Sequence, residues 1–300
     1  TRERRARAVA TAPDGERAAV LIMTAAAGRE AEEVRIVGVN GEESVPIYGP
    51  EVVSDPGGNP RVRQLAWSPD GEQLAVVRDD GSVWLAGPER DPEELLPGEG
   101  LTIDRLVWAP SGNGLAMLTR RPDGTGIVQV VALEEGDQVT IEPQSSFGDV
   151  GWIPGDALLV ATEDRAGGLT PAAGSLFTIL PDGTDRQLLL SAGEFGPTVG
   201  ISHLTPSPDG TMIAFVVNAP NLEGLLEFQA LWVLELETGA RRQFPVAAGQ
   251  GVNELWWIGD TLAWRATAAQ PNDIYDGAEP FVIEVADFEN STSRLIYTAD

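Results

Sequence analysis

LAWSPDGEQLAVV (65–77) decides the fold, because the same phrase returns along the whole chain. It consists of an apolar segment, a turn and a second apolar segment. In the turn Ser68-Pro69-Asp70-Gly71, proline presets its own φ, aspartate can accept backbone N–H groups through its side chain, and glycine tolerates positive φ. The stretch therefore predicts a β-hairpin with two apolar strands.

The phrase occurs six times. The other copies are ATAPDGERAAVLIM (10–23), LVWAPSGNGLAML (106–118), LTPSPDGTMIAFVV (204–217) and, with shortened turns, VGWIPGDALLVAT (150–162) and ELWWIGDTLAWRA (254–266). The turn centres are Pro13, Pro69, Pro110, Pro154, Pro208 and Gly259, at spacings of 41 to 56 residues. Repeats of this length indicate a propeller or an array, because one such unit cannot bury its apolar face alone.

Four strands fit each repeat. In the second copy they are VRQLAW (62–67), QLAVVR (73–78), VWLAG (83–87) and a segment near 93–96. Four short antiparallel strands joined by turns make one propeller blade. We therefore expect an all-β chain that forms a six-bladed β-propeller of four-stranded antiparallel blades. The single domain spans residues 1–300, with blades at about 1–50, 61–97, 102–143, 147–191, 200–246 and 251–299.

A tryptophan stands two positions before the turn centre in four repeats: Trp67, Trp108, Trp152 and Trp257. Because side chains alternate along a strand, these rings share one face with the apolar residue two positions earlier. We expect them to be core residues between neighbouring blades rather than ligand-binding groups.

The amino-acid composition limits the classes of molecule that the chain is expected to bind. The net charge is −26 and the isoelectric point is about 4.2. Such a surface repels phosphate backbones and anionic lipids, so nucleic acid is not an expected partner. The same charge keeps the chain soluble and can attract cations or a basic protein partner. The chain has no cysteine, which excludes disulfides, cysteine-ligated zinc and thiol catalysis. No run of 18 apolar residues occurs, so we expect no membrane insertion by this chain.

The Ser-Pro-Asp-Gly copies at 68–71 and 207–210, with their apolar flanks and the aromatic residue before Ser68, resemble the bacterial Trp-Asp-like repeats of TolB-type propellers. The chain is also similar to the propeller domain of the lipoprotein LpqB. The resemblance covers essentially all six repeats. It implies a protein-interaction role and an extracytoplasmic location, which means a periplasmic, secreted or membrane-anchored exterior domain. The basic segment 2–7 fits the flank of a removed signal or anchor.

Five polar residues stand five positions before the turn centres, where the remaining copy has Ala8. We call these five the collar: Gln64, Arg105, Asp149, His203 and Glu254. We expect them at the axial channel mouth opposite the Pro-Asp-Gly turns. Polar groups between apolar neighbours must be hydrogen-bonded or hydrated. Three interpretations stay open: a hydrated lining, a binding point for a ligand or partner side chain, and a divalent ion, calcium by its oxygen preference, held by Asp149, His203 and Glu254. We otherwise expect no cofactor.

Three connections between second and third strands are long: 163–174, 218–230 and 266–279. They belong to consecutive blades and should adjoin on the collar face. Long loops on a rigid scaffold often carry binding function. The expected partner-binding residues are Leu222, Leu225, Leu226, Phe228, Asp273, Tyr275 and Asp276.

The motifs of common enzymes are absent from the sequence. There is no Gly-x-Ser-x-Gly, no His-Glu-x-x-His, no P-loop and no dinucleotide fingerprint, and His203 is the one histidine. We therefore assign no catalytic residue. The predicted function is a non-enzymatic extracytoplasmic propeller that binds a protein, or a small molecule, through the long-loop face of blades 4–6. The alternative is a metal- or small-molecule-dependent enzyme, lactonase-like or sugar-processing, acting at the channel mouth.

Overall fold

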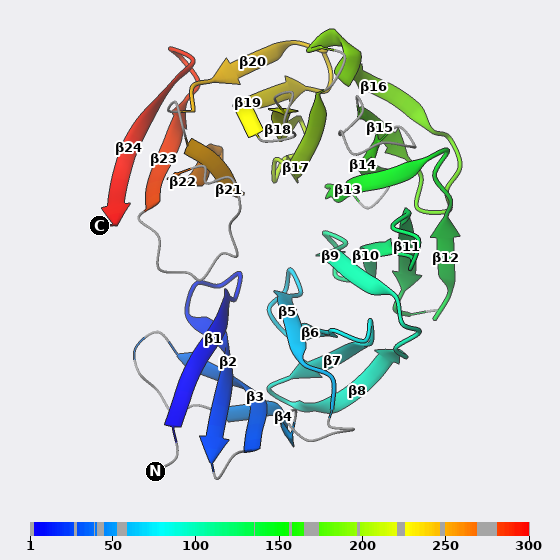
Figure 1. The fold of residues 1–300 in the computed structure, drawn as a ribbon, viewed down its shortest axis with the longest axis vertical. Coiled ribbons are helices and arrows are strands. Elements are labelled where there is room, and N and C mark those ends of the chain that lie inside the picture. Colours follow the sequence, from blue (N-terminus) through cyan, green and yellow to red (C-terminus); the bar gives the residue numbers. More distant parts are fainter. Residues whose placement is uncertain are drawn as a thin grey trace. The chain divides into compact units, whose positions relative to one another are not determined.

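The computed structural model describes residues 3–26, 29–38, 40, 45–52, 59–134, 136–155, 158–164, 174–196, 199–220, 226–246, 250–268 and 281–299. These residues form six antiparallel sheets of four strands each (Figure 1). Every sheet is built from four strands that follow one another in the sequence. The expected all-β fold of four-stranded antiparallel blades is confirmed.

The chain divides into two compact units: Thr1–Gly124 with Ala132–Gly136, and Thr125–Val131 with Asp137–Asp300. The first sheet contains β1 (Glu3–Thr11), β2 (Arg17–Ala26), β3 (Arg29–Gly38) and β4 (Val45–Val52). The second contains β5 (Val62–Trp67), β6 (Leu74–Arg78), β7 (Val83–Gly87) and β8 (Arg90–Leu96). The third contains β9 (Thr102–Trp108), β10 (Gly114–Arg120), β11 (Gly126–Ala132) and β12 (Gln138–Ile141).

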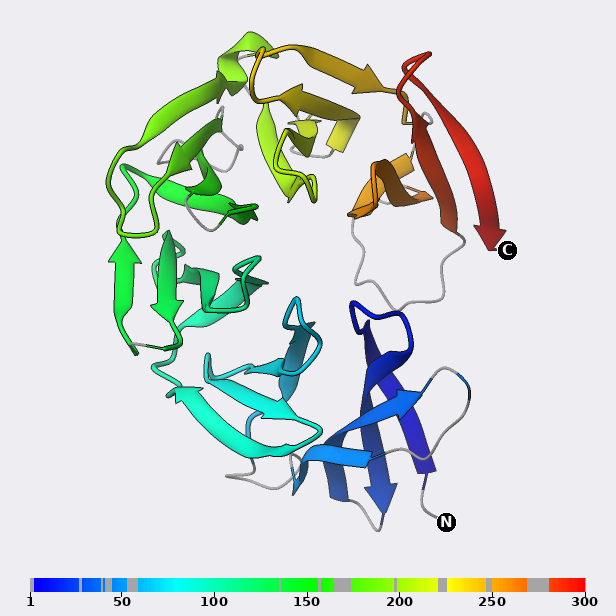
Figure 2. The ribbon, with the colours of Figure 1, turned by 180° about the vertical axis from the view of Figure 1, so that it is seen from behind.

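The second unit contains most of β11, all of β12 and the remaining three sheets. The fourth contains β13 (Ser146–Ile153), β14 (Leu158–Asp164), β15 (Ser175–Ile179) and β16 (Gln187–Ser191), followed by the short 3-10 helix η1 (Ala192–Glu194). The fifth contains β17 (Gly200–Pro206), β18 (Met212–Pro220), β19 (Leu226–Glu235) and β20 (Arg241–Phe244). The sixth contains β21 (Gln250–Ile258), β22 (Thr261–Ala268), β23 (Phe281–Asp287) and β24 (Thr292–Ala299). Figure 2 shows the same succession of sheets from the opposite side.

In every sheet the four strands lie side by side in sequence order, so the first and fourth strands form its two edges. We call the first strand of each sheet its inner strand and the fourth its outer strand. In the second, third, fifth and sixth sheets the second strand is the most deeply buried. Residues 74–77 of β6 and 213–216 of β18 are all 0% exposed. Such continuous apolar strands are expected where a sheet is covered on both faces. The core accordingly lies between sheets, for example where Phe215 of β18 packs with Leu190 of β16.

The repeated spacing of the tryptophans within the chain has a geometric basis. The indole N–H of Trp67 donates to the carbonyl of Ala10 at 2.9 Å, and that of Trp108 donates to Ala66 at 3.0 Å. Trp257 makes the equivalent bond to Thr205 at 2.9 Å. In each case the acceptor lies on the inner strand of the preceding sheet, three positions before the turn centre of that repeat. The core role expected for these rings is confirmed.

Candidate functional site

The Ser-Pro-Asp-Gly turns that follow β5 and β17 share the same hydrogen bonds. Ser68 Oγ donates to Asp70 Oδ1 at 2.6 Å and accepts the N–H of Gln73 at 2.9 Å. Asp70 Oδ1 also accepts the N–H of Glu72, and these bonds, the serine hydroxyl first, lower the pKa of Asp70. Gly71 has φ of 72°, which a side chain would disfavour. The hydroxyl of Ser68 and Oδ1 of Asp70 are thus both used within the turn, which they hold in shape.

The opposite ends of the inner strands all contain a β-bulge. In β5, Val62 pairs with Arg78 of β6 and Gln64 pairs with Val77, the adjacent residue of β6. Arg63 therefore has no partner residue of its own on β6 and is the extra residue of the bulge. The same shift occurs in the other inner strands, at Arg7, Asp104, Gly148, His203–Leu204 and Asn253. A bulge redirects the side chains beside it and is frequent near functional sites. The collar residues therefore stand next to or within the bulges.

Asp149 is the most buried collar residue, at 5% exposed. Its Oδ1 accepts the N–H of Val150 at 2.8 Å, and its Oδ2 accepts the N–H of Leu204 at 2.9 Å. Leu204 lies on β17 of the next sheet. A carboxylate that accepts backbone N–H groups makes strong, charge-assisted hydrogen bonds. Asp149 therefore ties the inner strands of two neighbouring sheets together.

His203 occupies a left-handed backbone conformation with φ of 58°. Such a conformation costs about 1 kcal/mol or more for a residue other than glycine. The residue stands immediately before the amide that Asp149 binds. Its Nδ1 lies 2.8 Å from Ser202 Oγ, which also accepts a hydrogen bond from Asn218 Nδ2 at 2.7 Å. The strained backbone thus coincides with the bulge of β17 and with the bond to the preceding sheet.

Two other inner strands begin with the same kind of bond to the preceding sheet. The N–H of Val62 donates to Glu32 Oε2 at 2.9 Å, and the N–H of Val252 donates to Gln229 Oε1 at 2.6 Å. Glu32 is 2% exposed, and Arg7 and Arg61 lie 3.6 and 3.5 Å from its Oε1. The sequence analysis missed these acceptors, because they lie on third strands far from the repeated turn.

The remaining collar residues are more open. Gln64 is partly exposed, and its Nε2 donates to the carbonyl of Leu106 at 3.4 Å. Arg105 is partly exposed on β9. Glu254 is 62% exposed and lies 3.8 Å from Arg265 on the paired strand. Asp149 accepts the N–H of Leu204, the residue that follows His203, whereas Glu254 lies near Arg265 of its own sheet.

A shared ion has no support in the described geometry. In the part of the chain that the structure describes, no three histidine, aspartate or glutamate side chains come together as a metal site would require. Both oxygens of Asp149 already accept backbone N–H groups. The ligand set Asp149, His203 and Glu254 is therefore not assembled here.

The expected partner-binding loops fall mostly outside the described residues. Leu222, Leu225, Asp273, Tyr275 and Asp276 all lie there. Leu226 and Phe228 are strand residues rather than loop residues, because β19 begins at Leu226 and pairs with β18 as far as Pro220. The expected loop 218–230 is thus shorter than predicted, since the apolar run that opens β19 continues the hairpin.

No protein-family model matches the chain. Among curated proteins, Coronin-7 of Bos taurus is 46% identical over 54 residues, which are 17% of this chain and 6% of that protein. The match therefore spans a small fraction of the length of the curated relatives.

Solved structures match along most of the chain. The β-propeller domain of the Trilobed protease from Pyrococcus furiosus has a TM-score of 0.65 at 14% identity, covering 99% of this chain and 86% of that one. Oligogalacturonate lyase in complex with manganese gives 0.64 at 15% identity, with coverages of 97% and 76%. Putative TolB from Agrobacterium tumefaciens gives 0.59 at 14% identity and covers 89% of each chain.

These likenesses establish the fold. The chain has a β-propeller fold like that of the TolB proteins and the Trilobed protease domain, and its six four-stranded sheets are the blades. The expected resemblance to TolB-type propellers is confirmed, while the similarity to LpqB stays a prediction. Among the described residues, no helix has the length and apolar character needed to cross a membrane.

Proposed function

We propose that the chain is a non-enzymatic, extracytoplasmic propeller that binds a basic protein partner. The hydrogen bonding of Asp149 carries the proposal. Both oxygens of Asp149 accept backbone N–H groups of two neighbouring inner strands, and the residue is 5% exposed, so its carboxylate is directed at the scaffold rather than at solvent. The most buried polar group of the collar thus serves the scaffold.

The charge supports the choice of partner. Asp and Glu outnumber Arg by 46 to 20, and the chain contains no lysine. A surface of one sign attracts partners of the opposite sign and increases their association rate. The extracytoplasmic location rests on the resemblance of the Ser-Pro-Asp-Gly repeats to TolB-type propellers. The more open collar residues Gln64, Arg105 and Glu254 and the long connections 163–174 and 266–279 remain the proposed docking elements.

The experiment that tests this function is capture followed by salt elution. The full chain is immobilised and incubated separately with envelope and cytosolic fractions of the source cells. We expect a basic protein in stoichiometric amount from the envelope fraction, released at roughly 0.5 M salt because screening weakens exposed charge pairs. The absence of any stoichiometric partner from both fractions would overturn the proposal.

A second measurement addresses the enzyme alternative. Elemental analysis of the purified chain and thermal unfolding with manganese, calcium or chelator report any bound ion. We expect no stoichiometric metal and an unchanged melting temperature. Stoichiometric metal together with turnover of a lactone or an oligosaccharide would assign the chain to the enzymes instead.

A further inference from the structure

Arginine is concentrated in the first unit. Of the 20 arginines, 14 belong to that unit, whereas the acidic residues divide equally between the two units. Two of these arginines, Arg7 and Arg63, are the extra residues of the bulges in β1 and β5. These inner strands belong to neighbouring sheets, which the indole bond of Trp67 to Ala10 joins. The bulges therefore place a cation at the same position on two neighbouring strands.

The other bulges differ in charge. The bulge of β9 holds Asp104, whose carboxylate accepts a hydrogen bond from Arg120 at 2.6 Å. The extra residues in the fourth and sixth sheets are Gly148 and Asn253, which are uncharged. Within the described inner strands, the open positive charge at the bulges is thus limited to the first two sheets.

Arg63 and Arg7 both keep donors that a ligand can reach. Arg63 is exposed, and its side chain makes no hydrogen bond or ion pair within the described part of the chain. The side chain of Arg7 is 50% exposed, and its Nη1 lies 3.6 Å from Glu32 Oε1, which is beyond hydrogen-bond distance.

A buried acid holds Arg7 beside a second guanidinium group. Glu32 is 2% exposed, and its Oε2 accepts the N–H of Val62 at 2.9 Å. Its Oε1 lies 3.5 Å from Arg61 Nη1 as well as 3.6 Å from Arg7, yet it accepts no hydrogen bond among the described residues. Arg61 is balanced separately, because it pairs with Glu30 at 2.6 Å. Glu32 therefore neutralises Arg7 only in part.

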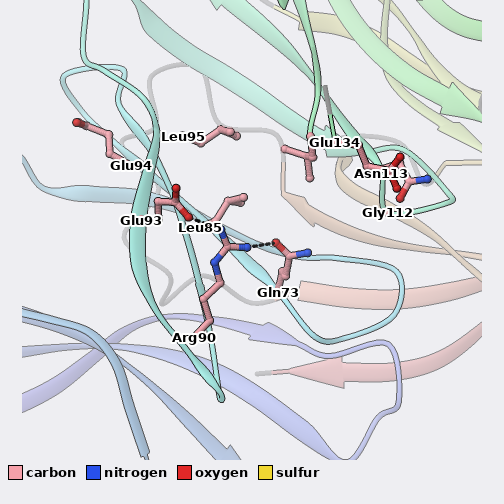
Figure 3. A pocket seen from close by; sticks show the side chains of 10 residues that line it. Gln73, Leu85, Arg90, Glu93, Glu94, Leu95, Gly112, Asn113 and Glu134 are labelled. Atoms are coloured by element: carbon pink, nitrogen blue, oxygen red, sulfur yellow. Dashed lines mark hydrogen bonds and ion pairs between the residues drawn. The ribbon is translucent and has the colours of Figure 1, made fainter. Parts of the chain in front are cut away.

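Arg90 shows the more usual state of an arginine in this chain. It lines a groove of about 490 Å³ beside β8 (Figure 3). Its guanidinium donates to Gln73 Oε1 at 3.1 Å and pairs with Glu93, as the dashed lines in Figure 3 show. Acidic residues outnumber arginines by 46 to 20, so partners for arginine are plentiful. Arg7 and Arg63 are distinguished by the donors that they leave unused.

The chemistry of arginine and the charge of the chain together select the ligand. A guanidinium group binds carboxylate and phosphate through paired N–H donors. A net charge of −26 repels any anion that extends past the two arginines by more than the screening length of about 8–10 Å. The surface therefore favours a small anion over a nucleic acid or an acidic protein.

We propose that Arg7 and Arg63 form a binding site for a small anion that carries at least two carboxylate or phosphate groups. One acidic group of the ligand pairs with Arg7 and another pairs with Arg63. The site goes beyond the protein-binding function proposed above, because its ligand has the opposite charge to the basic partner.

The test is isothermal titration calorimetry of the full chain with citrate and, separately, with inorganic pyrophosphate at pH 7 and low ionic strength. We expect saturable binding that the double variant R7Q/R63Q weakens about tenfold, because two exposed charge pairs are lost. The matched control is R90Q/R294Q, which removes the same charge from the outer strands β8 and β24. The control should bind as the wild type does.

A further variant tests the role of Glu32. In the sixth sheet the amide oxygen of Gln229 accepts the equivalent N–H, that of Val252, at 2.6 Å. Glu32→Gln should therefore keep the bond to Val62 while it removes the buried negative charge next to Arg7. We expect this variant to bind the anion about two- to fivefold more tightly. Unchanged or weaker binding would contradict the assignment of Arg7 to the site.

The results separate the source of the ligand and the two proposals. Binding of citrate alone assigns a carboxylate ligand, and binding of pyrophosphate alone assigns a phosphate ligand. Binding of neither probe to the wild type, or equal weakening by R7Q/R63Q and by R90Q/R294Q, overturns the anion site. Capture of a basic partner is a separate measurement, so its failure removes the protein-binding function and leaves the result for the anion site unchanged.

Discussion

The two ends of the inner strands differ in how strictly they repeat. At the turn end, Ser207 donates to Asp209 at 2.6 Å, as Ser68 does to Asp70, and each serine Oγ accepts a backbone N–H at 2.9 Å. At the bulge end the backbone shift recurs, but the side chains and their partners differ from sheet to sheet. The Ser-Pro-Asp-Gly turn thus recurs with the same hydrogen bonds in the second and fifth sheets, whereas the bulge recurs in all six inner strands with different side chains.

Removing the carboxylate of Asp149 should give the largest effect. Asp149→Ala leaves the buried N–H groups of Val150 and Leu204 without an acceptor, so we expect the free energy of unfolding to fall by about 3 kcal/mol. Urea denaturation measures the difference. Asp137→Ala, at an exposed position, is the control and should change stability by less than about 0.5 kcal/mol. Equal losses in the two variants would contradict the structural role of Asp149.

The indole N–H groups give the next effect. Trp108→Phe removes the bond to Ala66, whereas the buried Nε1 of Trp152 makes no hydrogen bond among the described residues. Both substitutions shorten the ring equally, so their difference isolates the N–H. We expect Trp108→Phe to cost about 1 kcal/mol more than Trp152→Phe in thermal or urea unfolding. Identical costs would show that the indole bond contributes nothing to packing between sheets.

The serine of the turn comes third. Ser68→Ala removes the hydroxyl that bonds Asp70 and the N–H of Gln73, and should cost about 1 kcal/mol at pH 7. The effect should depend on pH. Because folding lowers the pKa of Asp70, this group contributes stability above its unfolded pKa of about 4, and the contribution is lost as pH falls through the lower folded value.

Losing the hydroxyl moves the pKa of Asp70 back toward its ordinary value. The stability difference between wild type and Ser68→Ala should therefore shrink below about pH 4. Urea unfolding at several pH values measures it. A difference that stays constant down to acid pH would mean that the serine acts independently of the carboxylate.

The smallest effect is expected at the exposed member of the collar. Glu254→Gln should change the free energy of unfolding by less than about 0.5 kcal/mol, because the carboxylate is 62% exposed and 3.8 Å from Arg265. A double-mutant cycle with Arg265→Gln measures the coupling directly. A coupling energy above about 1 kcal/mol would show that Glu254 contributes to stability as Asp149 does, which contradicts this prediction.

The fold could be predicted from the sequence because its signal is local. Each Pro-Asp-Gly turn and its two apolar strands lie within about a dozen residues, and the observed strands β5 and β7 match the expected ranges. The bulges had no such signal. The extra residues include Arg63, Gly148 and Asn253, which share neither charge nor size.

The candidate site was predicted only in part for a related reason. The turn spacing correctly aligned Gln64, Asp149 and Glu254, but the function of each depends on partners that spacing does not identify. Asp149 and Leu204 are 55 residues apart, and nothing in either segment marks the other.

The succession of the sheets has a consequence for biosynthesis. Since each sheet uses four consecutive strands, its hydrogen-bonded partners emerge from the ribosome together, and a nascent chain can finish one sheet before the next is translated. Only the contacts between sheets, such as the indole bond of Trp108 to Ala66, must wait for a later segment. The sheets can therefore form one after another, in the order in which the ribosome synthesises them.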